Sequence, residues 1–315
     1  MSTMPFFQPS IRPLPADLDF QGQTIIVTGA SSGLGLEFRE QTKATLLADP
    51  SIRKSDTRAD IRVMKFDADS FESTKAFAAQ VKQEFKQVHV LMLNAGANGI
   101  TFEQTKDGHE KTVQVNLLAN TLLFFELLPL LEETAEQTGK PTRMSMTGSR
   151  MYDTGSLCKM PSSKIPEQVI KYLDDPTTFQ GFFRYGDSKI LVLLFIHQLG
   201  KLYGSHKVIV NNFCPGMVDT PMTKNLPWYL RVPVAALGQL RRIGKVEHGG
   251  WIGLNAAAVA GPESHGQLIG DTEVEEIDAF YGSDAMRLLA QRLWQETVEE
   301  VAGFGAVPEW ANADN

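Results

Sequence analysis

The sequence predicts an α/β protein with a doubly wound, mostly parallel sheet. Short runs of β-branched and apolar residues recur along the chain, and each ends in small or polar residues. A segment with helical spacing follows most of these runs. Strands that alternate with helices are typical of a parallel sheet covered by helices.

The expected elements follow one another from the N-terminus. Residues 1–20 are rich in proline and predict an extended arm, and residues 21–315 predict a single domain. We expect strands in QTIIVTGA, ADIRVMKFDAD, VHVLMLNAGA, PTRMSMTGS and HKVIVNNFCPG. We expect helices from Leu36, over 70–85 behind an N-terminal serine, over about 112–133 and over about 184–203.

Composition limits the function classes. The 315 residues carry a net charge of −7, which argues against nucleic acid and anionic membranes as partners. Two cysteines without metal-binding spacing fit a reducing cytoplasm, and the six scattered histidines predict no metal site. We expect no signal peptide and no membrane span, because the N-terminus lacks an apolar core and the leucine-rich runs are too short.

A glycine-rich turn, TGASSGLG at Thr28–Gly35, follows the first predicted strand and opens a predicted helix. Glycine permits a tight turn and lets backbone N–H groups approach a pyrophosphate at the positive end of a helix. This context predicts a dinucleotide site, although a purely structural turn is the alternative.

Several motifs in order resemble the short-chain dehydrogenase/reductase family over about residues 22–300. They are TGASSGLG, NAG at Asn94–Gly96, Asn116 in VQVN, Ser149 in MTGS, Tyr185 and Lys189 in YGDSK, and Pro215–Gly216. The chain looks especially similar to fungal retinol-dehydrogenase-like members of secondary metabolism. The resemblance implies one Rossmann-type domain that carries both the cofactor and the substrate.

The resemblance also implies roles for individual residues. Ser149 would hydrogen-bond the substrate oxygen, Lys189 would hold the nicotinamide ribose, and Asn116 would position a water, with Ser145 and Thr147 as alternatives to Ser149. The implied cofactor-binding residues are Gly29, Ser31, Ser32, Gly33, Leu34, Gly35, Asp49, Arg53, Asp67, Asn94, Ala95, Gly96, Tyr185, Lys189, Pro215, Gly216, Val218 and Thr220. For Asp67, a solvated strand end is the alternative.

Tyr185 and Lys189 lie four residues apart and therefore share one face of the predicted helix. A free tyrosine has a pKa of about 10, and a nearby ammonium favours the phenolate. We therefore expect Lys189 to lower the pKa of Tyr185 and so to prepare the phenol for proton transfer.

The interval from Gly35 to Asp67 is shorter than the family pattern implies. At the end of a second strand, an acidic residue takes the ribose hydroxyl of NAD, whereas basic residues accept the phosphate of NADP. Asp49 points to the first and Arg53 with Lys54 to the second. The resemblance favours NADP(H) over NAD(H), because fungal relatives with this glycine turn tend to use it, and a weakened adenosine pocket is the alternative.

Two further stretches of sequence are expected to lie around the predicted active site. An insertion at about 151–182 separates Ser149 from Tyr185, and a lid at about 217–245 is rich in apolar residues, which predicts an apolar substrate. Packing against the domain or a partner is the alternative for the lid. The helices that contain Leu117–Leu131 and Ile190–Leu199 are apolar nearly all round, so one side can face the sheet while the other meets a further surface. The resemblance implies that this surface is the same pair of helices in a second subunit, and we therefore expect a homodimer.

The sequence thus predicts an NAD(P)(H)-dependent oxidoreductase that acts on a carbonyl or secondary alcohol of an apolar small molecule, such as a fungal secondary metabolite. A non-redox acid/base enzyme on the same fold is the main alternative, and a non-catalytic binding protein is the third. The acidic stretch EVEEID and the late helix LLAQRLWQETVEEV are expected to be solvated faces without chemistry.

Overall fold

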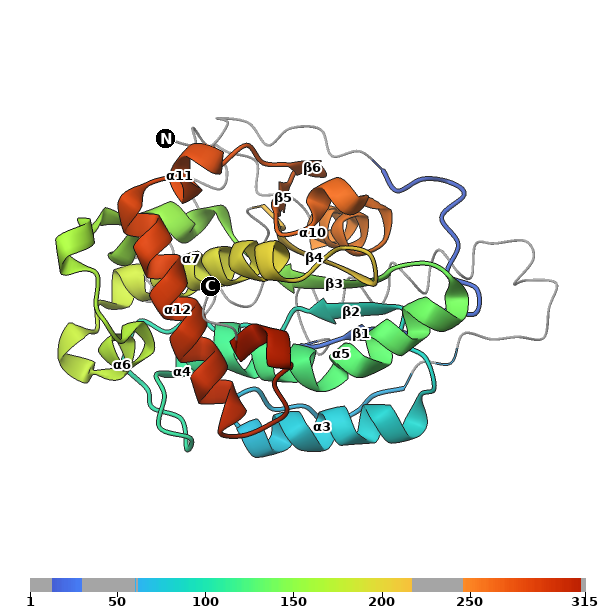
Figure 1. The fold of residues 1–315 in the computed structure, drawn as a ribbon, viewed down its shortest axis with the longest axis horizontal. Coiled ribbons are helices and arrows are strands. Elements are labelled where there is room, and N and C mark those ends of the chain that lie inside the picture. Colours follow the sequence, from blue (N-terminus) through green and yellow to red (C-terminus); the bar gives the residue numbers. More distant parts are fainter. Residues whose placement is uncertain (1–12, 30–59, 61, 217–245, 313–315) are drawn as a thin grey trace.

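A computed structural model describes residues 13–29, 60, 62–216 and 246–312 (Figure 1). Within them, six strands form one sheet in the order β1-β2-β3-β4-β5-β6. Neighbouring strands are parallel except for β5 and β6, which are antiparallel. The strands are β1 (Ile25–Val27), β2 (Val90–Leu93), β3 (Thr142–Thr147), β4 (Val208–Cys214), β5 (Leu268–Gly270) and β6 (Glu273–Val274). The predicted α/β class with a mostly parallel sheet is confirmed.

Helices cover both faces of this sheet (Figure 1). The α-helices are α3 (Phe71–Glu84), α4 (Lys111–Val113), α5 (Ala119–Thr138), α6 (Val169–Asp174), α7 (Gly181–Leu202), α10 (Val246–Leu254), α11 (Asp278–Tyr281) and α12 (Asp284–Ala302). Two π-helical turns are η1 (Gln114–Leu118) and η6 (Asn255–Val259). The 3-10 turns are η2 (Arg150–Thr154), η3 (Leu157–Lys159), η4 (Ser162–Lys164), η5 (Pro176–Thr178), η7 (Pro262–Ser264) and η8 (Glu309–Asn312).

Alternation along the strands separates the two cores. Leu91, Leu93 and Val210 join the core beneath α5 and α7. Val90, Met92 and Phe213 face the opposite way and pack against α10 and η6. Because successive strand residues point to opposite faces, a strand buried on both sides needs a continuous apolar run, and β2 reads VLML.

The long apolar helices are found where the sequence predicts them. The first is longer than expected, since α4, η1 and α5 run on from Lys111 to Thr138. By length and composition it is the one helix among the described residues that could cross a membrane, but 83% of its most apolar window is buried inside the protein. It is therefore a core helix of this fold.

The predicted strand ADIRVMKFDAD is wrong for the part of it that the structure describes. Residues 62–67 form no strand. Val63 is 85% exposed, whereas Met64 and Phe66 pack against the core, with the Phe66 ring 5.2 Å from that of Phe77 on α3. The segment thus packs its apolar side chains on a helix without pairing with β1, and pairing is what defines a strand.

The C-terminal helix α12 is not a solvated tail. It lies across α7 (Figure 1). Trp294 stacks on Phe195 with ring centroids 5.1 Å apart. Trp310 in η8 packs against Phe125 of α5 and Tyr203. These contacts within the chain cover apolar surface of α5 and α7, on which the homodimer prediction depends. The homodimer remains a prediction, but the apolar surface of these two helices no longer supports it.

The predicted insertion at about 151–182 is built of η2, η3, η4, α6 and η5. Carboxylates on the two long helices hold it by its backbone. Asp187 of α7 accepts the Leu157 N–H at 2.9 Å, and Glu296 of α12 accepts the N–H groups of Ile170 and Lys171 at 2.7 and 3.0 Å. Such charge-assisted bonds fix the segment to α7, which carries Tyr185, and to α12.

Candidate active site

Parallel strands bring the predicted site residues to one edge of the sheet. Val27 pairs with Met92, Leu93 with Met146, and Thr147 with Phe213, so the carboxyl ends of four strands lie side by side. The loops that leave these ends contain Gly29, Asn94–Gly96, Ser149 and Pro215–Gly216. Crevices outside the carboxyl ends of strands are where open α/β sheets bind ligands.

Tyr185, Lys189 and Ser149 come together at this edge. A side-chain hydrogen bond joins Ser149 to the Tyr185 phenol. One helical turn further along α7, the Lys189 ammonium donates to the Thr147 carbonyl at 2.8 Å and lies 5.5 Å from the centre of the Tyr185 ring. The serine is also the N-cap of η2, where its Oγ accepts the Met151 N–H at 3.1 Å. The strand end and the helix thus fix three of the four predicted catalytic side chains.

The expected lowering of the Tyr185 pKa by Lys189 is wrong for this structure. Burial raises the pKa of Tyr185 to about 12, the Cys214 thiol adds to the rise, and the bond from Ser149 opposes it. Burial also lowers the pKa of Lys189 to about 8, so its charge is itself weakened. The Lys189 ammonium donates a hydrogen bond to the Thr147 carbonyl and lies over the Tyr185 ring, not at the phenol oxygen. The phenol is therefore held protonated at neutral pH.

Asn116 is connected to the same helix through Ser188. Its Nδ2 donates to the Ala97 carbonyl at 3.0 Å and to Ser188 Oγ at 2.8 Å, while its Oδ1 accepts the Ala97 N–H at 2.7 Å. Ser188 in turn donates to the Tyr185 carbonyl at 2.8 Å. Asn116 lies in the π-helical turn η1, and such turns frequently mark functional sites.

The end of β1 is joined tightly to the end of β2. Thr28 Oγ1 accepts the N–H groups of Asn94 and Ala95, each at 3.0 Å, and Asn94 Nδ2 donates to the Thr28 carbonyl at 3.1 Å. Gly29 has a φ of +67°, and a Cβ there would lie 2.9 Å from Ala95 Cα. Glycine is required at this position, both for its backbone conformation and for its close approach to β2.

Part of the predicted cofactor site lies outside the described residues. These positions are Ser31, Ser32, Gly33, Leu34, Gly35, Asp49, Arg53, Val218 and Thr220, together with Lys54 and the lid at 217–245. Asp67 is described and exposed, and its Oδ1 accepts the Asp69 N–H at 3.1 Å near the start of α3. The structure thus gives Asp67 a local turn contact.

Arg150 is a residue beside the site that the sequence did not single out. It follows Ser149 and pairs with Glu275, and with Asp271 at 2.6 Å. Its backbone N–H donates to Cys214 Sγ at 3.3 Å. The expectation that EVEEID is only a solvated face is therefore wrong at Glu275, whose carboxylate is mostly buried. Arg150 links the serine turn to the ends of β4 and β5.

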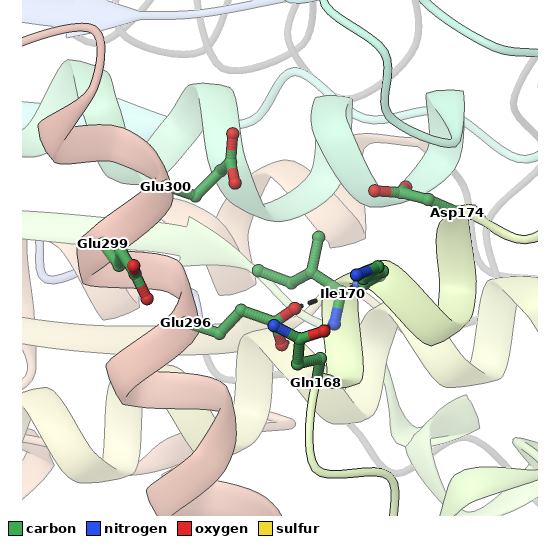
Figure 2. Close-up of a pocket in the computed structure, with 7 residues that line it drawn as sticks. Gln168, Ile170, Asp174, Glu296, Glu299 and Glu300 are labelled. Carbon is green, nitrogen blue, oxygen red and sulfur yellow. Dashed lines mark hydrogen bonds between the residues drawn. The ribbon is translucent and has the colours of Figure 1, made fainter.

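An acidic pocket of about 270 Å³ lies between α6 and α12 (Figure 2). Its lining residues are Gln168, Ile170, Lys171, Asp174, Glu296, Glu299 and Glu300. Figure 2 shows the Glu296 carboxylate directed at the Ile170 backbone, to which it is hydrogen-bonded. The pocket contains none of the predicted site residues, so we assign the chemistry to the sheet edge and not to this pocket.

Comparison with known proteins agrees with this geometry. The family model for short chain dehydrogenases matches residues 23–149 and 177–228, and the unmatched gap corresponds to the insertion. The chain therefore belongs to the short chain dehydrogenase family. It is 39% identical to short chain dehydrogenase yanD of Aspergillus niger over 96% of this chain and 98% of the relative. It is also 39% identical to short-chain dehydrogenase/reductase tropG of Talaromyces stipitatus, over 98% and 99% of the two chains.

Solved structures share this fold at low sequence identity. The NADPH-bound carbonyl reductase from chicken fatty liver is 19% identical, with a TM-score of 0.55 over 80% of this chain and 98% of that chain. A 3-ketoacyl-(acyl-carrier-protein) reductase from Brucella melitensis complexed with NADH is 16% identical, with a TM-score of 0.55 over 80% and 97%. Membership of the family identifies this short chain dehydrogenase as an NAD(P)-dependent oxidoreductase.

Proposed function

We propose that this short chain dehydrogenase moves hydride between NADP(H) and a carbonyl or secondary alcohol of an apolar small molecule. The observation that carries the proposal is the convergence of Tyr185, Ser149 and Lys189 at the sheet edge, with the Lys189 ammonium 5.5 Å from the centre of the Tyr185 ring. A proton donor and a second hydroxyl that converge on one point suit a carbonyl oxygen that gains negative charge.

The residues act in the reducing direction as follows. Tyr185 donates its proton to the substrate oxygen, and a pKa of about 12 keeps that proton in place at neutral pH until charge develops on the substrate. Ser149 hydrogen-bonds the same oxygen and steadies the developing alkoxide. The positive charge of Lys189, 5.5 Å from the ring centre, favours the phenolate that results, and by the family resemblance the ammonium also holds the nicotinamide ribose. The bound cofactor supplies the hydride.

The described residues fit a dinucleotide at this edge. Gly29 supplies a backbone position free of a side chain, and Asn94, Ala95 and Gly96 leave small groups at the end of β2. The preference for NADP(H) depends on Arg53 and Lys54, outside the described residues. Titration of the protein with NADP(H) and with NAD(H) measures this preference.

The substrate class is inferred from several sources. The lid at about 217–245 is rich in apolar residues, and the curated relatives in Aspergillus and Talaromyces are fungal, which supports a fungal secondary metabolite as substrate. The net charge of −7 and the cysteine content support a cytoplasmic enzyme without a nucleic-acid partner.

Replacement of one phenol tests the proposal. We expect Tyr185→Phe to lower NADPH-dependent reduction of 9,10-phenanthrenequinone by a factor of about 10²–10⁴, because the phenylalanine cannot donate a proton. The matched control is Tyr203→Phe, which removes a phenol bonded to Glu132 at the far end of α7. The assignment of Tyr185 would be wrong if both variants kept the turnover of the unmodified protein.

A further inference from the structure

Apolar side chains are exposed beside Ser149 and Tyr185. Five large apolar residues are exposed among the described residues, and three of them, Met151, Phe182 and Phe183, lie within three positions of Ser149 or Tyr185. Single exposed apolar side chains are ordinary on a protein surface, but a group of them marks a binding site.

Phe182 shares a stripe of α7 with the predicted catalytic pair. Phe182, Tyr185 and Lys189 occupy positions i, i+3 and i+7, which align along one face of a helix. Lys189 and Tyr185 lie toward the sheet edge, and Phe182 stands one turn nearer the start of the helix, where it is 68% exposed. Phe182 therefore lies on the same face of the helix as Tyr185, one turn away and exposed to solvent.

Met151 lies in η2, the turn that packs against the start of α7. It lies two residues after Ser149, and its N–H donates to Ser149 Oγ. The helix and the turn are in close contact there, since a Cβ on Gly186 would lie 2.9 Å from the Met151 carbonyl oxygen. Met151 is 39% exposed, so the turn that contains Ser149 also presents an adaptable thioether side chain to solvent.

We propose that Phe182 and Met151 form the apolar wall that selects a planar, aromatic substrate for the Ser149–Tyr185 pair. An aromatic ring against Phe182 gains buried area and ring contact, whereas a small polar carbonyl compound gains neither. This inference rests on the proposed function for the position of the reacting oxygen, but it concerns binding and needs neither cofactor nor turnover.

The neighbouring Phe183 gives a matched control. It is 37% exposed, close to the exposure of Met151, but it points about 100° away from Phe182 around the helix. The Lys159 ammonium lies 5.1 Å from its ring centre, on the side of η3. Loss of the Phe183 ring removes a comparable side chain from the same turn without touching the stripe that contains Tyr185.

The experiment is a titration at pH 7 with 2-naphthol, whose fused rings and hydroxyl match the proposed wall and hydroxyl pair. Its fluorescence is followed in the unmodified protein, Phe182→Ala, Met151→Ala and Phe183→Ala, without cofactor. We expect Phe182→Ala to raise the Kd at least about fivefold and Met151→Ala at least about twofold. We expect Phe183→Ala to leave the Kd within about 1.5-fold, with the thermal midpoints of all three variants close to that of the unmodified protein.

Two results would overturn the inference: no saturable binding of 2-naphthol to the unmodified protein, or equal effects of Phe182→Ala and Phe183→Ala. Binding of NADPH to the same variants is measured in parallel. A protein that binds 2-naphthol through Phe182 but does not bind NADPH would contradict the proposed function and leave the apolar wall standing.

Discussion

At the residue scale, the pairing of Tyr185 with Lys189 could be predicted from their spacing, but its electrostatics could not. Spacing places two side chains on one face, and that is confirmed. The pKa of each group depends on burial, which the spacing of two residues does not reveal. Burial raises the pKa of Tyr185 to about 12 and lowers that of Lys189 to about 8.

The lowered pKa of Lys189 has a consequence for cofactor binding. The ammonium is present below pH 8 and is lost above it, so any binding that depends on its charge weakens as the pH rises through that value. We expect the Kd for NADPH to rise several-fold between pH 7 and pH 9.5. Lys189→Met should weaken binding at pH 7 and flatten the dependence.

Fluorescence titration at several pH values measures this effect. The control is Lys201→Met on the exposed last turn of the same helix, which should keep the pH dependence. The role given to Lys189 would be refuted by a Kd that is constant over this pH range in the unmodified protein.

Other contacts of the site have no signal in a single sequence. Ser188 joins Asn116 to the Tyr185 backbone, and Arg150 bridges the serine turn to Glu275. The Asn116–Ser188 and Arg150–Glu275 contacts cross between segments far apart in the chain, and only the folded structure brings those segments together. A serine inside YGDSK or an arginine after a strand is otherwise an ordinary surface residue.

At the element scale, His109 ties three segments together. Its Nδ1 lies 2.8 Å from Asp174 Oδ2 on α6, and its Nε2 lies 3.1 Å from Glu300 Oε1 on α12. A neutral imidazole can donate from only one nitrogen, so two carboxylate partners favour the doubly protonated ring. Burial opposes the charge, but the two carboxylates outweigh it and raise the pKa of His109.

The stability supplied by His109 should therefore depend on pH. Its pKa is higher in the folded protein than the ordinary value of about 6.5, so the stabilisation is complete below that value and is lost as the pH rises through the raised folded value. We expect His109→Gln to lower the free energy of unfolding by about 2 kcal/mol at pH 6. The loss should be smaller at pH 9.

Urea unfolding at both pH values measures this difference. His206→Gln is the matched control, because His206 is exposed. A cost of His109→Gln that is the same at pH 6 and pH 9 would show that the imidazolium does not stabilise the junction of α6 with α12.

At the scale of the whole molecule, the fold class follows from local patterns, while the outer packing does not. Strands such as VLML and VIVNNFC are readable because both faces of a parallel strand are buried. The role of α12 is not readable, because its apolar stripe and the apolar faces of α5 and α7 could equally meet a second subunit. The structure joins them within one chain through Trp294 and Phe195.

The central claim is that this chain is a redox enzyme of its family, and the short interval from Gly35 to Asp67 bears on it directly. Its residues decide the adenosine pocket, and the remainder of the site is assembled at the sheet edge without them. A chain with Tyr185, Lys189, Ser149 and Asn116 in place but no adenosine pocket would suit acid/base chemistry without hydride transfer.

The most direct measurement is a titration of the purified protein with NADPH, NADP⁺, NADH and NAD⁺, by nicotinamide fluorescence for the reduced forms and calorimetry for the oxidised forms. We predict micromolar binding of the NADP(H) pair and weaker binding of the NAD(H) pair. The absence of binding by all four at millimolar concentrations would contradict the redox assignment, and the non-redox acid/base enzyme would take its place.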